Sequence, residues 1–260
     1  ALAGKGCHAN YFNVAWQNDN LHEAAGSYAN SAGYKNSYIL APNYPAGKDA
    51  LTGYKRFFSG DLAGETFTKL GQTDYAAEIA AIRAANPKMV YHFLPGGMGI
   101  NFLKQYAQAG LMDKIPLVLS GAGMEARILG AVGETAMGVA STSHWSADLD
   151  NAANKAFVAG YMKEYGKAPS VYSSQGYDTA NLILSALDKA SVDDKDAFRA
   201  ALKAAEFDSV RGDFKFGDNH HPIQNIYVRE VMKEGDVITN KIIGTALENH
   251  SDAYVNECKM

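Results

Sequence analysis

The chain has 260 residues, of which 47% are hydrophobic and 20% charged, a composition that fits one large or two modest globular domains. Its 24 basic and 28 acidic side chains give a net charge of −4, and without a lysine or arginine run it offers no electrostatic surface for nucleic acid. No apolar run is long enough to cross a bilayer, and the N-terminus lacks the basic and apolar regions of a signal peptide.

Two cysteines, Cys7 and Cys258, lie near opposite ends of the chain. In an oxidising compartment they could bridge the termini. Two unrelated thiols explain the sequence equally well, because a bond requires a proximity that spacing alone does not show. The chain begins with alanine rather than methionine, so we expect a processed, trimmed or partial chain.

The first half of the sequence alternates helix and strand signals. Apolar residues at helical spacing predict a helix over 21–32, and a short apolar run predicts a buried strand over 38–41. Further helices are expected over 51–58, 75–85 and 101–110, with Asn101 as a cap, and further strands over 65–70, 89–94, 116–119 and 137–140. Strands that alternate with helices predict a parallel, doubly wound α/β sheet.

The pattern changes after Trp145. Three helices are expected around 157–165, 177–187 and 198–205, followed by strands at 214–216, 226–231 and 237–243, the last two joined by a hairpin turn. The helices have apolar faces but no visible sheet to cover, and a lone domain does not tolerate such exposed faces. Either they form a bundle, or the sheet that they cover is missing from this chain.

Two loops, 42–48 and 95–99, follow buried strands. Small-molecule sites in open α/β sheets lie where strands run into such loops. The sequence contains no dinucleotide-binding glycine pattern, Walker lysine, nucleophile elbow or helix with metal-spaced histidine and glutamate residues. Adjacent His220 and His221 would point to opposite faces of a strand rather than at one metal. The sequence therefore predicts capture of a solute, not an enzyme, and no cofactor.

Several segments together resemble periplasmic solute-binding proteins of the branched-chain amino acid type, which have the type I fold and serve ABC importers. These segments are 11–19, 43–49, 95–98, 108–111, 143–145 and 175–178. The resemblance covers essentially the whole chain. It implies two doubly wound lobes joined by three crossovers, with ligand in the cleft between them.

The resemblance also implies that the chain starts near the first crossover and lacks most of the N-terminal lobe's sheet. The C-terminal lobe would comprise 15–142 and 226–260, residues 1–14 would be a crossover remnant, and 143–225 would be what remains of the N-terminal lobe. With one lobe incomplete, we expect the 260-residue chain to bind its ligand weakly or not at all.

The candidate ligand-binding residues follow from the resemblance. They are Trp16, Gln17 and Asn18 at the first crossover, Tyr44, Pro95, Gly96, Ser120 and Gly121 after strands, His144 at the second crossover, and Tyr177. Each has a structural alternative. Tyr44 could cover a turn, the glycines could serve a strand-to-helix turn, Trp16 could pack at a hinge and His144 could bond a carbonyl. For Tyr177 we favour core packing, because its neighbours are apolar at helical spacing.

The family's amino acid binders hold the ligand ammonium with an acidic residue just after the strand that corresponds to 116–119. Residues 120–123 contain no acid, and the next is Glu125. A buried ammonium without a carboxylate is costly, so we expect a ligand that lacks an α-ammonium. The aromatic residues around the expected cleft, and the resemblance of segments 16–19, 95–99 and 143–145 to one subgroup of the family, imply an aromatic carboxylate of the benzoate or phenylpropenoate type. The implied partner is the membrane permease of an ABC importer, in the periplasm and without direct membrane insertion. The alternatives are an amino acid or amide binder, and the ligand-sensing domain of a signalling protein.

Overall fold

A computed structural model describes residues 1–260, and the chain divides into two compact units. Unit 1 comprises residues 1–20, 144–225 and 248–260, and unit 2 comprises residues 21–143 and 226–247. This division differs from the expected lobes, because residues 15–20 and 248–260 belong to unit 1. The last segment is held there by a disulfide between Cys7 and Cys258 and by Asn219 Nδ2, which donates to an oxygen of Asp252 at 2.6 Å.

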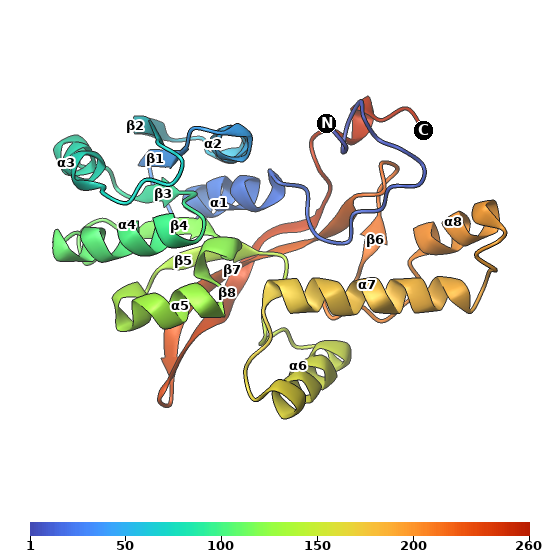
Figure 1. Cartoon of the computed structure of the whole chain (residues 1–260). Helices are drawn as coiled ribbons and strands as arrows, with labels where there is room; N and C mark the ends of the chain where they lie inside the picture. Colours follow the sequence, from blue (N-terminus) through green and yellow to red (C-terminus); the bar gives the residue numbers. More distant parts are fainter. The chain divides into compact units, whose positions relative to one another are not determined.

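Unit 2 is built on the parallel sheet that the sequence predicts (Figure 1). Its strands are β1 (Asn36–Pro42), β2 (Asp61–Thr68), β3 (Val90–His92), β4 (Leu117–Ser120) and β5 (Ala140–Ser143). They run parallel in the order β2-β1-β3-β4-β5, and β7 (Pro222–Glu234) pairs antiparallel with β5. The central strands are apolar runs buried on both faces, as parallel sheets require.

Helices cover both faces of this sheet. They are α1 (Asn20–Ser31), α2 (Pro45–Phe57), α3 (Ala76–Ala85), α4 (Gly97–Gln108) and α5 (Ala126–Val132). Leu40 of β1 packs with α3, α4 and α5, whereas Ile39 on the opposite face packs with α1 and α2. The two faces differ because successive side chains of a strand point in opposite directions.

Several boundaries in unit 2 differ from the predicted ones. Helix α4 begins at Gly97 rather than at Asn101, because Gly96 takes a φ of +62° and turns the chain into the helix four residues early. Helix α2 begins at Pro45, a residue suited to the first helical turn. The strand expected at 137–140 is β5 at Ala140–Ser143, and the seven-residue α5 was not predicted.

Unit 1 contains the three predicted helices, α6 (Ala152–Tyr165), α7 (Val171–Leu187) and α8 (Lys195–Ala204). Each begins at a residue whose side chain accepts a backbone N–H of the first turn, namely Asn151, Ser170 and Asp194. The short strand β6 (Lys215–Phe216) pairs with the start of β7, and β8 (Val237–His250) pairs with β7. A small apolar core joins Leu182 of α7 to Ala205 and Phe216.

Helices α6 and α7 do not seal their apolar faces against each other. The large apolar side chains that they leave exposed are Met162, Tyr165, Tyr172, Tyr177, Ile183, Leu184 and Leu187. An open groove of about 360 Å³ runs between the two helices. The helices therefore do not form the self-sufficient bundle that was one of the two expectations. No helix in the chain has both the length and the apolar character needed to cross a membrane.

Candidate functional site

The edge of unit 2 at which β1, β3 and β4 end carries a strip of aromatic rings. Tyr44, directly before α2, stacks on Phe93, which follows β3, with ring centroids 6.4 Å apart and planes at 9°. The ring of His22 from α1 meets Phe93 edge-on at 5.0 Å. Burial raises the pKa of the half-buried Tyr44 phenol, so its hydroxyl keeps its proton and can donate a hydrogen bond. A flat apolar ligand could stack on such a strip.

His22 belongs to this strip as a neutral side chain. It is buried, and its Nδ1 is hydrogen-bonded to the hydroxyl of Tyr91. Burial lowers the pKa of His22 to about 3, an effect that the nearby Glu23 only partly opposes. The His22 ring is therefore uncharged at neutral pH and cannot form an ion pair with an anionic ligand.

A small void lies next to the ends of β3 and β4. His92, Pro95 and Ser120 border this void of about 10 Å³, the space of a single water. Ser120 is buried, and neither ring nitrogen of His92 has a hydrogen-bond partner. Burial lowers the pKa of His92 to about 3, so its ring is also neutral. Ser120 is the last residue of β4, and its side chain is buried.

Gly121 follows Ser120 and begins a single-turn 3-10 helix, Gly121–Met124, in the loop after β4, and its position has no room for a side chain. A Cβ on Gly121 would lie 2.8 Å from Arg229 Nη2, from Ser143 Cβ and from the Thr142 carbonyl oxygen. Arg229 Nη2 donates to the Gly121 carbonyl at 3.2 Å and pairs with Glu125 at 3.1 Å, and both side chains are almost fully buried. This buried ion pair holds the loop in place. It also occupies Glu125, the carboxylate nearest to Gly121 in the sequence.

Pro95 and Gly96 lie on the same edge, between β3 and α4. Gly96 is exposed, and a Cβ there would meet nothing within 4 Å, but its φ of +62° is one that side-chain residues rarely adopt. The glycine is thus required by the turn into α4, which was the structural alternative. The exposed backbone of Gly96 and Gly97 at the start of α4 is also open to a ligand.

Unit 1 brings together a separate group of predicted residues. The rings of Trp16 and His144 lie 5.2 Å apart, and Gln175 Nε2 lies 3.3 Å from His144 Nε2. His144 is fully buried and Trp16 half-buried. Gln17 uses both ends of its amide on Asp19, donating at 3.2 Å and accepting from its backbone N–H at 2.9 Å.

Tyr177 does not join this group. It is two residues from Gln175 on α7 and therefore points to a different side of the helix. Its ring lies 4.8 Å from Phe157 and borders the groove between α6 and α7. With 42% of its surface exposed, it is also not the core residue that we favoured.

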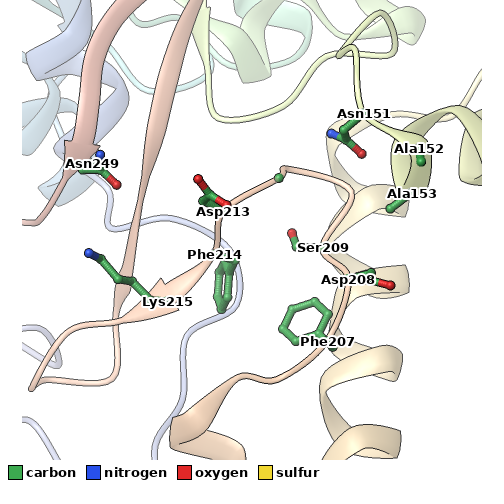
Figure 2. A pocket seen from close by; sticks show the side chains of 11 residues that line it. Asn151, Ala152, Ala153, Phe207, Asp208, Ser209, Asp213, Phe214, Lys215 and Asn249 are labelled. Atoms are coloured by element: carbon green, nitrogen blue, oxygen red, sulfur yellow. The ribbon is translucent and has the colours of Figure 1, made fainter.

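A larger hollow of about 710 Å³ lies elsewhere in unit 1 and contains none of the predicted residues (Figure 2). It is lined by the N-terminal residues of α6, the segment 207–215 and Asn249. Its charged residues are Asp208, Asp213 and Lys215, so the lining has a net negative charge and does not favour an anionic ligand.

Sequence reasoning missed several residues of these two groups. Phe93 and His22 complete the aromatic strip, Gln175 contacts His144, and Arg229 fixes the Gly121 loop. Phe93 lies in the strand predicted over 89–94, and Gln175 lies in segment 175–178, which carries the family resemblance, so the sequence contained an indication for both. Arg229 is 108 residues from Gly121, and nothing local indicates that contact.

Comparison with known proteins gives one consistent result. A family model described as periplasmic binding protein matches residues 1–236. A solute-binding protein of an ABC transporter from R. palustris, solved in complex with benzoate, is 30% identical with a TM-score of 0.90, over 100% of this chain and 71% of that one. A second solute-binding protein, from Rhodopseudomonas palustris BisB5 in complex with 3,4-dihydroxybenzoic acid, is 29% identical with a TM-score of 0.79, over 92% of this chain and 68% of that one.

A curated relative, Leu/Ile/Val-binding protein homolog 6 of Brucella melitensis, is 32% identical over 215 residues. The match covers 78% of this chain and 55% of the relative. The chain thus spans about half the length of the curated relatives that it matches.

Proposed function

This chain belongs to the periplasmic binding protein family, and we propose that it is the solute-binding component of an ABC importer and captures a small aromatic carboxylate. Membership places it among binding proteins rather than enzymes, and the family's periplasmic location agrees with the expected extracytoplasmic one. The observation that carries the proposal is the aromatic strip of Tyr44, Phe93 and His22 beside the acid-free loop at Ser120 and Gly121.

The aromatic strip accounts for part of the required affinity. Burying about 150 Å² of a ligand ring would contribute roughly 3–4 kcal/mol at about 25 cal/mol per Å². Micromolar binding needs about 8 kcal/mol, so hydrogen bonds to the carboxylate must supply the rest. The Tyr44 hydroxyl and the backbone N–H groups at the start of α4 are the donors that this edge offers.

The lack of an available acid argues against an amino acid ligand. An α-ammonium placed at the 120–123 loop would have no carboxylate partner there. The nearest carboxylate, Glu125, pairs with the buried Arg229, and breaking that pair would leave a buried charge uncompensated. Solved relatives that hold benzoate and dihydroxybenzoate support the same ligand class.

Capture of a branched-chain amino acid is the second candidate, because the curated relatives carry that name. Ligand-observed NMR, which detects millimolar affinities, separates the two. We expect saturation transfer from the protein to benzoate, 4-hydroxybenzoate and cinnamate, and none to leucine. Transfer to leucine alone would overturn the proposal, and transfer to no compound would show that these residues alone are insufficient.

Two pairs of variants test whether the saturation transfer comes from a ligand at the Tyr44 edge of unit 2. Tyr44→Ala should abolish transfer to benzoate, whereas Tyr165→Ala, which truncates an exposed tyrosine of unit 1, should leave it unchanged. Ala122→Glu adds an acid to the loop and should weaken benzoate binding about tenfold, or about 1.4 kcal/mol. The neutral Ala122→Gln should have a much smaller effect.

A further inference from the structure

Unit 1 contains a buried ion pair that lies outside both groups of predicted residues. Arg211 Nε donates to a carboxylate oxygen of Asp178 at 2.9 Å, and the two side chains are 2% and 0% exposed. The same carboxylate accepts from Ser209 Oγ at 2.7 Å and from the backbone N–H of Val210 at 3.0 Å. Asp178 of α7 therefore anchors the loop that carries Arg211.

The other end of the Arg211 guanidinium reaches two distant segments. Its Nη1 donates to the carbonyl oxygen of Ala15 at 3.1 Å and to Gln224 Oε1 at 2.9 Å. Gln224 Nε2 donates to the same Ala15 carbonyl at 3.2 Å. One carbonyl is thus held by two buried donors. Ala15 directly precedes Trp16, and Gln224 lies next to the point where the chain leaves unit 1.

Stability alone is a poor explanation of this arrangement. Desolvating a guanidinium and a carboxylate costs about as much as their attraction returns, and apolar residues of the same size often serve as well. Arg211 Nη2 is moreover buried without a hydrogen-bond partner. A planar guanidinium can instead fix the positions of the groups that it binds, because its donors have a fixed geometry.

We propose that Arg211 is a positioning residue that fixes the Ala15 carbonyl and thereby holds the Trp16 ring beside His144. The relevance of that placement to a ligand rests on the proposed function. The placement itself does not, so the two can be tested separately.

The test measures the Trp16–His144 placement directly. In a protein with selectively labelled tryptophan and histidine, nuclear Overhauser cross-peaks between the two rings report their proximity. Arg211→Lys keeps a charge for Asp178 but cannot reach both Ala15 and Gln224, and Gln224→Leu removes one donor and leaves the ion pair intact. We expect the cross-peaks to be lost in Arg211→Lys and weakened in Gln224→Leu, with helix content and melting temperature retained in Gln224→Leu.

Arg199→Lys is the matched control, because this guanidinium of unit 1 donates hydrogen bonds to the side chains of Asn10 and Asp196 near the surface. It should leave the cross-peaks unchanged. If Arg211→Lys does not fold, Gln224→Leu alone decides the outcome. Unchanged cross-peaks in folded Gln224→Leu and Arg211→Lys would overturn the proposal, since the arginine would then contribute stability only.

A parallel titration with benzoate separates this proposal from the proposed function. Loss of the cross-peaks with benzoate binding weakened about threefold or more supports both. Loss of the cross-peaks in a protein whose parent does not bind benzoate supports the placement and overturns a role for it in benzoate binding by this chain. Loss of the cross-peaks with unchanged benzoate binding would overturn a role for the placement in binding.

Discussion

The two units of this protein are stabilised by different kinds of contact. In unit 2, helices cover both faces of a parallel sheet, and residues such as Ile82 and Leu103 are completely buried. In unit 1, α7 buries Leu182 to 2% exposure but leaves Leu184 58% exposed. Besides a small apolar core, unit 1 is stabilised by covalent and polar contacts, namely the disulfide, the Asn219 hydrogen bonds and the Arg211 network. An apolar helix face therefore stabilises a unit only where another layer covers it.

The largest expected effect tests this contrast in apolar burial. Leu103→Ala in unit 2 and Leu182→Ala in unit 1 should each lower the free energy of unfolding by about 2–5 kcal/mol, because each leaves a cavity. Leu184→Ala, on the same helix as Leu182, should change it by no more than about 0.5 kcal/mol. Chemical denaturation followed by circular dichroism measures all three. A loss of several kcal/mol in Leu184→Ala would mean that its face is covered in solution.

The disulfide provides the next effect and should be confined to unit 1. Cys7 and Cys258 are separated by 251 residues, and both lie in unit 1. Replacing both by serine should lower the stability of that unit by about 2–4 kcal/mol, since the bond restricts the unfolded chain. Native-state hydrogen exchange should show faster exchange at α7 and unchanged exchange at β3 and β4. Equal acceleration in both units would contradict the separation.

The third effect is a pH dependence of unit 2, which is the smallest of the three only when it is counted per pH unit and per histidine. Burial lowers the pKa of His22 and of His92 to about 3, below the value of about 6.5 for an unfolded histidine. Between these values the unfolded chain binds more protons, so stability is complete above about pH 6.5 and falls as the pH decreases towards 3. Each histidine contributes a slope of up to about 1.4 kcal/mol per pH unit.

Substitution separates this histidine effect from general acid denaturation. His92→Gln should reduce the slope of unfolding free energy against pH between about 4 and 6. The measurement is denaturant unfolding at several pH values. An identical slope in His92→Gln and in the parent would show that His92 is not a neutral buried group.

Sequence reasoning predicted what depends on local periodicity. Strands β1, β3 and β4, helix α3 and the three helices of unit 1 all follow from apolar runs or apolar spacing. The start of α4 was wrong because the φ of Gly96, not a polar cap, begins that helix. Helix α5 was missed because seven residues carry too little periodicity.

The candidate site was predictable only in part, for a related reason. Tyr44 and Gly121 were named from the family resemblance, and the structure places both just after strands, where loops after parallel strands meet at one edge. Residues that act through distant partners carried no local signal. Arg211 is 196 residues from Ala15, and Arg229 is 108 residues from Gly121. Such pairs are set by the topology of the fold, which single-sequence patterns do not contain.

A crystal structure of the chain grown with 4-hydroxybenzoate tests the central claim most directly. We predict that the ligand ring lies on the strip of Tyr44 and Phe93, with its carboxylate accepting hydrogen bonds from the Tyr44 hydroxyl or the backbone at Gly96 and Gly97. Density for the ligand in the groove between α6 and α7, with none at the edge of unit 2, would contradict the claim.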